Sequence, residues 1–401
     1  MLAPCRVFAQ SHRMATVHII GAGVSGLAAA TLLAERHVPV KLYEASTHAG
    51  GRCRSSQHRS LGTVDHGLYV TSPADTQWQR YLTRIGASDA TVTFAAPPLP
   101  RAPLADYAQA LLMLGGHGQV SQLPAENWLR EGWLAPWVRG IFGQAMEHMP
   151  VGALRHQWRR LCRRHLAMAA RQASEDYISP ALSTLEAWGG SVYFGHALSK
   201  LEWDGARPTH LHFARKKIPL APDDIIILAV PGPIAHGLLP SLPVPLPMQP
   251  AITVHFHSLH RETVPSLVFP VDAPMDMIRY SAERMSVSIR VATRAWPRSD
   301  GAIAAQLWRA LQQLHPYLAQ LPTPPHVVIR EKQAGHTVAP LTPVDAQQGA
   351  IILAGDWLDP LQPATLEIAT AHGHRAAELA MAQLPQKHRP TQQHFYLNSR
   401  N

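Results

Sequence analysis

Mostly apolar runs of residues recur in three separated parts of the chain. The first part has a strand over residues 17–20, a helix of small residues predicted over residues 27–35, and a second strand over residues 38–43. The later runs cover residues 225–230 and 351–354, and neither alternates with polar positions. Strands that are buried on both faces of a parallel sheet have this pattern. The chain is therefore predicted to contain an α/β domain built on a parallel sheet.

A glycine motif follows the first of these strands. Gly21-x-Gly23-x-x-Gly26 stands between strand and helix, and Glu44 ends the second strand. The three glycines permit a tight turn, close approach of the backbone to a pyrophosphate, and close packing of helix on strand. The helix N-terminus favours the anion, and the acid can accept hydrogen bonds from a ribose diol. The pattern predicts a dinucleotide site, with contacts from Gly21, Ala22, Gly23, Ser25, Gly26 and Glu44.

A second glycine turn comes directly after the acidic strand. Gly50 and Gly51 let the chain pass tightly beneath a cofactor, and Arg52 can pair with its phosphates. Alone, such a turn could equally be a surface loop with a solvated arginine. The glycine motif before it disfavours that alternative. A nicotinamide-only enzyme has no need of a second glycine turn directly after the acidic strand, so the turn favours a different dinucleotide. The combination resembles the FAD domain of the flavin amine oxidase and phytoene desaturase superfamily. This resemblance implies that the cofactor is FAD.

The C-terminal part of the chain carries a further motif. A buried strand ends in Gly355-Asp356, where the carboxylate is expected to reach ribityl or pyrophosphate oxygens. Pro363 is expected to start a helix that extends to about residue 383. Its first N–H groups would face the flavin N1–C2=O edge and stabilise the negative charge of reduction. The cofactor contacts predicted beyond the glycine turns are Leu198, Gly355, Asp356, Pro363, Ala364 and Thr365.

Stretches of different character separate the three parts. Residues 73–188 have helical periodicity and many tryptophans, whereas residues 246–335 contain alternating strands and a helix. We therefore predict a Rossmann-like FAD-binding domain of the glutathione reductase type, with an inserted α+β substrate domain. The FAD domain would comprise residues 15–72, 189–245 and 336–385, and the substrate domain residues 73–188, mainly helical, and 246–335. The Gln-, His- and Pro-rich tail, residues 386–401, is predicted to be disordered.

The resemblance narrows when the motifs are taken together. The chain is similar over most of residues 15–385 to the hydroxysqualene dehydroxylases, also called squalene-associated FAD-dependent desaturases. The segments that carry this resemblance cover residues 128–130, 136–137, 227–231, 250–255, 328–334, 352–357 and 361–369. It implies reductive removal of an allylic hydroxyl from a thirty-carbon isoprenoid alcohol, with hydride from reduced flavin N5. The protein must then protonate the leaving hydroxyl, exclude water from a carbocation and hold an apolar chain.

Two segments depart from the family pattern. Asp65-His66-Gly67 stands where the family has Asp-Asn-Gly, and it resembles the Asp-His-Gly of renalase-like flavoproteins. Ala334-Gly335-His336 replaces the family's Ala-Thr-Phe, and the middle of the chain is shorter. The candidates for the acid are His66 and Tyr69, because their segment is expected near the isoalloxazine. The alternative role for each is a structural hydrogen bond.

Composition excludes some classes of function. The apolar runs are too short to cross a bilayer, and three cysteines without metal or redox spacing fit a reducing cytosol. No nucleic-acid motif accompanies the net charge of +9, and no Gly-x-Ser-x-Gly elbow indicates a hydrolase. The basic residues 155–164, with Trp158, Leu161 and Leu166, predict a helix whose face either contacts an anionic membrane or is simply solvated. We expect a cytoplasmic protein, peripheral to the inner membrane face if that helix binds lipid.

Several points stay open at this level. His255, His257 and His260 lie on or just past one strand, but no further ligands accompany them, so no metal is predicted. His372 and His374, in the last helix, are expected at the surface or in packing beside the cofactor. The first 13 residues lack the apolar core of a signal peptide, and Met1 and Met14 are both candidate starts.

The alternative functions fall into two classes. One is another enzyme of the superfamily: an amine oxidase, a renalase-like oxidase or a carotenoid desaturase. The other is a flavin-binding partner without catalysis. The electron donor is not identified by any motif, and neither are the stereochemistry and the oligomeric state.

Overall fold

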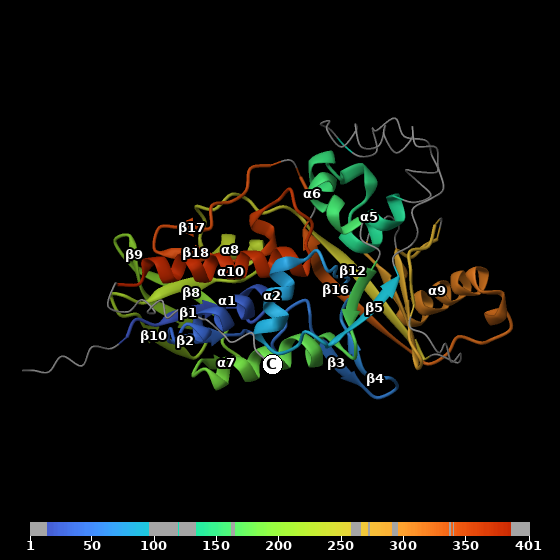
Figure 1. Cartoon of the computed structure of the whole chain (residues 1–401), viewed down its shortest axis with the longest axis horizontal. Helices are drawn as coiled ribbons and strands as arrows, with labels where there is room; N and C mark the ends of the chain where they lie inside the picture. Colours follow the sequence, from blue (N-terminus) through green and yellow to red (C-terminus); the bar gives the residue numbers. More distant parts are fainter. Residues whose placement is uncertain are drawn as a thin grey trace, which may run out of the picture.

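The computed structural model contains an α/β part and a strand-rich part side by side (Figure 1). In the α/β part, a central sheet lies among helices, and in the other part an antiparallel sheet carries one long helix. The residues that the structure describes are 14–95, 119, 134–161, 165–257, 266–271, 273–290, 296–336, 338–339 and 341–385.

The central sheet has the strand order β17-β18-β11-β1-β2-β7. All neighbouring strands are parallel except the edge pair β17 and β18. The strands come from three separated stretches of the sequence, so residues far apart in the chain meet at one sheet edge. Their bounds are β1 (Val17–Ile20), β2 (Val40–Tyr43), β7 (Ser191–Tyr193), β11 (Ile225–Leu228), β17 (Gln347–Gln348) and β18 (Ile351–Leu353).

Helices cover one face of this sheet and a small antiparallel sheet covers the other. The two long helices in the helical layer contact closely, because a Cβ on Gly373 would lie 2.2 Å from the carbonyl oxygen of Ser25. The helical layer contains α1 (Val24–Glu35), α2 (Thr76–Arg84), α7 (Ser179–Ala187) and α10 (Leu366–Gln383). The opposite layer contains β8 (Leu198–Asp204), β9 (Arg207–Phe213), β10 (Lys216–Pro219) and α8 (Gly232–Leu238).

The strand-rich part is a five-stranded antiparallel sheet of order β13-β14-β15-β12-β16. One face packs on α9 (Asp300–Leu314), and a second apolar layer lies around α5 (Ala135–Phe142) and α6 (Val151–Leu161). The sheet strands are β12 (Met248–His257), β13 (Ser266–Val268), β14 (Met277–Tyr280), β15 (Arg284–Ile289) and β16 (His326–His336). Short turns of helix are η3 (Met146–His148), η4 (Ser174–Ile178), η5 (Pro316–Leu318) and η6 (Asp356–Leu358).

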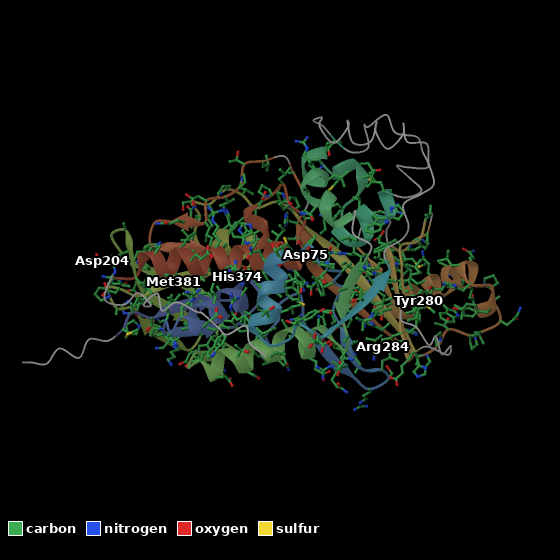
Figure 2. All side chains as sticks on the ribbon, viewed as in Figure 1. Asp75, Asp204, Tyr280, Arg284, His374 and Met381 are labelled. Atoms are coloured by element: carbon green, nitrogen blue, oxygen red, sulfur yellow. The ribbon has the colours of Figure 1, made fainter. Side chains whose placement is uncertain are left out.

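A hairpin joins the two parts. It consists of β3 (Ser55–His58) and β4 (Gly62–Asp65), which follow the second glycine turn. Arg284 of β15, labelled in Figure 2, donates to the carbonyl oxygens of Thr63 at 2.8 Å and Leu61 at 2.7 Å. The hairpin therefore fixes the antiparallel sheet next to the glycine turn.

The prediction for residues 73–188 was incomplete, because this stretch also contains a pair of strands. β5 (Thr91–Ala95) and β6 (His165–Ala169) are antiparallel partners. Leu166 lies on β6 and not on the basic helix, since α6 ends at Leu161. Leu166 and Met168 are buried in the same apolar cluster as Phe94 of β5. In the basic cluster, Arg155 is exposed, while the side chains of residues 158–160 and all of residues 162–164 lie outside the described part.

The C-terminal helix begins later than predicted. Thr365 caps α10, and its Oγ1 accepts a hydrogen bond from the Ile368 N–H at 3.3 Å. Pro363 therefore precedes the helix, because a threonine hydroxyl satisfies the free N–H groups of a first turn and proline has no side-chain acceptor. The predicted disordered tail lies outside the described residues, as do residues 1–13. Among the described residues, no helix combines the length and the hydropathy needed to cross a membrane.

Candidate cofactor and active site

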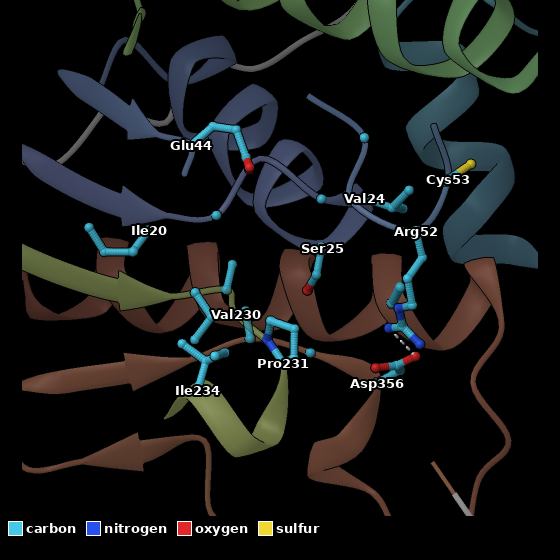
Figure 3. A pocket seen from close by; sticks show the side chains of 18 of the residues that line it. Ile20, Val24, Ser25, Glu44, Arg52, Cys53, Val230, Pro231, Ile234 and Asp356 are labelled. Atoms are coloured by element: carbon cyan, nitrogen blue, oxygen red, sulfur yellow. Dashed lines mark hydrogen bonds and ion pairs between the residues drawn. The ribbon is translucent and has the colours of Figure 1, made fainter. Parts of the chain in front are cut away.

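A cavity of about 430 Å³ opens at the carboxyl ends of the parallel strands (Figure 3). The loops after β1, β2, β11 and β18 all contribute to its wall, as does the first turn of α10. Ligands of open α/β sheets bind at this edge, and the volume is in the range of small-molecule sites. The predicted cofactor residues that line it are Gly21, Gly23, Ser25, Glu44, Gly50, Gly51, Arg52, Leu198, Gly355, Asp356, Ala364 and Thr365.

Three predicted residues lie next to the cavity without lining it. Gly26 packs where a Cβ would lie 1.9 Å from the carbonyl oxygen of Gly21, so its role is close packing of α1 on β1. Ala22 donates its backbone N–H to Glu44 Oε2 at 2.8 Å. Pro363 does not line the cavity, but Ala364 and Thr365, which follow it, do.

Gly23 differs from its neighbours in the motif. It is the N-cap of α1 with φ −73°, and a Cβ built on it would meet nothing within 4 Å. The protein itself would therefore tolerate a side chain here. The second glycine turn is held against it, because the Gly50 N–H donates to the Ala22 carbonyl oxygen at 2.8 Å. The absence of a side chain at Gly23 leaves room for a ligand between the two turns.

Glu44 is fixed in place by its neighbours. Besides the Ala22 N–H, its carboxylate accepts hydrogen bonds at Oε1 from the N–H and hydroxyl of Ser46, each at 2.9 Å. The carboxylate retains lone pairs for further donors. A pair of ribose hydroxyls would be suitable donors at this end of the cavity.

Arg52 and Asp356 form an ion pair across the cavity wall. Arg52 Nη2 lies 2.6 Å from Asp356 Oδ2, and Arg52 Nη1 donates to the carbonyl oxygen of Ala334 at 3.1 Å. Figure 3 shows the guanidinium directed at the carboxylate. Burial alone would raise the pKa of Asp356, but Arg52 and His336 outweigh it and hold that pKa below its usual value. Asp356 is therefore ionised at neutral pH, and Arg52 keeps N–H groups for a phosphate or ribityl oxygen.

The two candidate acids are both engaged in hydrogen bonds within the protein. His66 is outside the cavity lining; its Nδ1 accepts from Arg54 Nε at 3.0 Å and its Nε2 bonds Ser56 Oγ at 3.1 Å. Burial and then Arg54 lower its pKa. Tyr69 lines the cavity, but its hydroxyl donates to the Arg52 carbonyl oxygen, and burial raises its pKa. These contacts match the structural alternative for each residue, and a role in proton transfer stays a prediction.

Sequence reasoning missed part of the lining. The loop after β11 contributes Val230 and Pro231, α8 contributes Ile234, and Trp357 follows Asp356. Trp357 Nε1 donates to the Val230 carbonyl oxygen at 2.9 Å, which ties the loops after β11 and β18 together. The rule that parallel strands end at one edge could have indicated the β11 loop. Ala334 reaches the cavity from the antiparallel sheet, and the sequence marks it only as part of a segment that departs from the family pattern.

Ser25 provides a test of whether a dinucleotide fits this cavity. Its hydroxyl is buried in the first turn of α1, has no hydrogen-bond partner among the described residues, and projects into the cavity in Figure 3. A buried hydroxyl at a helix N-terminus suits a phosphate oxygen. The open space at Gly23 and the fixed carboxylate of Glu44 add room for the pyrophosphate and an acceptor for ribose. The residues present therefore fit a dinucleotide.

The histidine cluster is dispersed in the structure. His255 is buried, with its Nδ1 2.8 Å from Ser286 Oγ and its Nε2 2.8 Å from the Asp65 carbonyl oxygen. His257 is exposed, and His260 lies outside the described residues. Where residues are described, no three His, Cys, Asp or Glu side chains gather as metal ligands.

The other singled-out side chains also have structural surroundings. His374, labelled in Figure 2, is buried where α10 meets α2 and bonds Arg84 and Gln77, so it is not a surface residue. His372 is half-buried on the same helix. Cys53 is a buried free thiol, and Cys5 and Cys162 lie outside the described residues.

His255→Gln is expected to flatten the acid side of the stability profile. Burial lowers the pKa of His255 to about 3, so the folded ring stays neutral where an unfolded histidine takes up a proton. The contribution of the neutral His255 ring to the unfolding free energy is complete above pH ~6.5. It decreases by about 1.4 kcal/mol per pH unit as the pH falls towards 3. Urea unfolding between pH 4 and 7 measures this slope. His257→Gln, at an exposed position of the same strand, is the control, and an unchanged slope in His255→Gln would contradict the assignment.

Comparison with known proteins agrees with this geometry. Residues 19–85 match the model of an NAD(P)-binding Rossmann-like domain. The hydroxysqualene dehydroxylase of Rhodopseudomonas palustris is 29% identical over 92% of this chain and 98% of its own length. That of Zymomonas mobilis is 26% identical over 92% of this chain and 100% of its own. The cyclohexylamine oxidase of Brevibacterium oxydans has a TM-score of 0.64 at 15% identity, covering 92% of this chain and 99% of that one. The fold class is therefore confirmed.

Proposed function

The chain is an oxidoreductase related over nearly its whole length to the hydroxysqualene dehydroxylases, and we propose that it binds FAD and converts hydroxysqualene to squalene. The relationship over 92% of the chain carries the proposed substrate. The cavity at the sheet edge, with the glycine turns, Glu44 and the Arg52–Asp356 pair around it, supports the proposed cofactor. Removal of an isoprenoid hydroxyl would place the reaction in squalene and hopanoid synthesis.

Each part of the cofactor would have a place in the cavity wall. The N-terminus of α1, with the Ser25 hydroxyl, would bind the pyrophosphate, and Glu44 would accept hydrogen bonds from the adenosine ribose. Arg52 and Asp356 would orient the phosphate and ribityl oxygens. The first turn of α10 would stabilise negative charge at the pyrimidine edge of the ring. When bound and reduced, the flavin supplies the hydride.

The surroundings of the cavity suit an apolar substrate. The layer around α5 and α6 is built of buried apolar side chains, among them Trp137, Met146, Met149 and Leu154. Such a layer excludes water from a carbocation and offers aromatic faces to positive charge. The exposed Arg155 on α6 supports peripheral contact with the anionic inner face of the cell membrane. The electron donor is an unassigned partner.

An anaerobic experiment tests the function. The purified protein is reduced in detergent, hydroxysqualene is added, and flavin reoxidation is followed together with extraction of the lipid product. Stoichiometric reoxidation with formation of squalene is expected. If the protein contains flavin but hydroxysqualene does not reoxidise the reduced flavin, the substrate assignment is wrong, although the assignment of a flavin-binding fold stands. Amines and carotenoids would then be tested as substrates, and a flavin that none of them oxidises or reduces would favour a non-catalytic partner.

A further inference from the structure

His336 lies where the cofactor cavity meets the apolar layer. It is the last residue of β16, two positions after Ala334, which lines the cavity. His336 does not itself line the cavity, but it lies next to the cavity wall: a Cβ on Gly335 would lie 3.3 Å from the Cβ of Ala364, which lines the cavity. The charges of Asp356 and Arg52 also act on the His336 imidazole. Two residues further on, Val338 belongs to the apolar cluster around α5 and α6, together with the partly buried Leu361. Along the chain, His336 therefore stands between a residue of the cavity wall and a residue of the apolar layer.

One ring nitrogen of His336 is fixed by the protein. Nε2 lies 2.8 Å from the backbone carbonyl oxygen of Gln362. A carbonyl oxygen can only accept, so Nε2 carries the hydrogen. In a neutral ring, Nδ1 then has a free lone pair. Burial lowers the pKa of His336, although Asp356 acts in the opposite direction, so the ring is neutral at physiological pH.

The other ring nitrogen has no partner among the described residues. Nδ1 is buried, the residue is 1% exposed, and no described donor is within hydrogen-bond distance. The backbone around the ring is well held, because the His336 carbonyl oxygen accepts from Gln144 Nε2 at 2.9 Å. A buried acceptor without a donor destabilises a fold unless a ligand supplies the donor. The geometry therefore leaves one fixed acceptor at the border of the cofactor cavity and the apolar layer.

We infer that Nδ1 of His336 accepts a hydrogen bond from the hydroxyl group of the bound substrate. The inference rests on the proposed function and adds to it a residue that binds the alcohol. The apolar layer would hold the hydrocarbon chain, and His336 would hold the C–O bond at the cavity. An alcohol satisfies the lone pair, whereas the hydrocarbon product leaves it without a donor. The site therefore binds the alcohol more tightly than the hydrocarbon.

Two substitutions separate this role from a structural one. In His336→Gln, the side-chain amide nitrogen can replace Nε2 and keep the bond to the Gln362 carbonyl oxygen, while the acceptor at Nδ1 is lost. In His336→Asn, the shorter side chain can place an oxygen near the position of Nδ1 but cannot reach Gln362. A purely structural histidine predicts that the Asn variant is the more damaged one. Substrate binding predicts the reverse order for affinity.

The measurement is a titration of the oxidised holoenzyme in detergent with hydroxysqualene and, separately, with squalene, followed by flavin absorbance. The wild type should prefer the alcohol, and His336→Gln should lose about tenfold of alcohol affinity with little change for squalene. His336→Asn should retain most of the preference. Flavin content and Tm of each variant show whether the fold is intact.

The outcomes are distinguishable from failure of the proposed function. If the wild type forms no squalene but His336→Gln still weakens alcohol binding selectively, the reaction is wrong and the hydroxyl site stands. If the wild type turns over but His336→Gln binds both lipids as the wild type does, the hydroxyl site is wrong. A wild type without preference for the alcohol overturns the inference even if neither variant folds.

Discussion

Gly26→Ala is expected to disrupt the fold, whereas Gly23→Ala should fold normally and lose its flavin. A Cβ on Gly26 would lie 1.9 Å from the Gly21 carbonyl oxygen and 3.2 Å from the Ala229 Cβ, and neither atom can rotate away. Overpacking against movable side chains already costs about 1–3 kcal/mol, so we expect a loss of at least about 3 kcal/mol of unfolding free energy. A Cβ on Gly23 meets nothing within 4 Å and would enter the space that we assign to the pyrophosphate.

Thermal unfolding and flavin absorbance of the two purified variants separate these effects. Gly26→Ala should show a lowered Tm or yield no soluble protein. Gly23→Ala should unfold like wild-type protein from which the flavin has been removed, and it should be colourless. Full flavin occupancy in Gly23→Ala would show that the pyrophosphate lies elsewhere. If Gly26→Ala had the same Tm as Gly23→Ala, the packing argument for Gly26 would be wrong.

The second large effect is expected at the Arg52–Asp356 ion pair in the cavity wall. Arg52→Met leaves the carboxylate of Asp356, which is 6% exposed, without its cation. Breaking a fully buried pair costs about 3–5 kcal/mol, and we expect roughly 2–3 kcal/mol because the Arg52 side chain is 30% exposed. The double variant Arg52→Met with Asp356→Asn should regain part of this loss, since the amide carries no charge. All these variants should bind flavin poorly.

Urea unfolding of the single and double variants measures this coupling, and flavin stoichiometry measures cofactor binding. Arg330→Met, which removes an exposed partner of Asp300, is the control and should change the unfolding free energy little. If the double variant is less stable than Arg52→Met alone, the unpaired charge of Asp356 is not what destabilises the folded Arg52→Met protein.

The sequence allowed the sheet edge to be located because its signals are local. The glycine turn, the acid after the next strand and the Gly-Asp ending each mark a place where backbone conformation or burial restricts the residue type. The start of α10 was misplaced because proline and threonine both signal a helix start, and the cap bond that decides between them is seen only in the structure. The pair β5–β6 was missed because Leu166 also fits the helical spacing of the preceding basic residues.

Side-chain roles were harder to predict for a different reason. His66 stood out in the sequence through its neighbours, but Arg54 and Ser56 occupy both of its ring nitrogens. His336 has a ring nitrogen without a partner among the described residues, but the sequence marks its segment only as a departure from the family pattern and does not show which atom is available. Which lone pair remains available depends on contacts such as that with Gln362, which only tertiary structure brings about.

The order of the central sheet has a consequence for synthesis of the chain on the ribosome. β1 lies between β2 and β11, so until residues 225–228 emerge it has a neighbour on one side only. Arg52 and Asp356 are 304 positions apart, so the nascent chain carries half of the ion pair through most of translation. An apolar strand with an open edge is prone to aggregation, and chaperones protect such intermediates. A chain that ended before β18 would contain the whole glycine motif but lack Gly355, Asp356 and the first turn of α10, so we expect it to bind a dinucleotide more weakly.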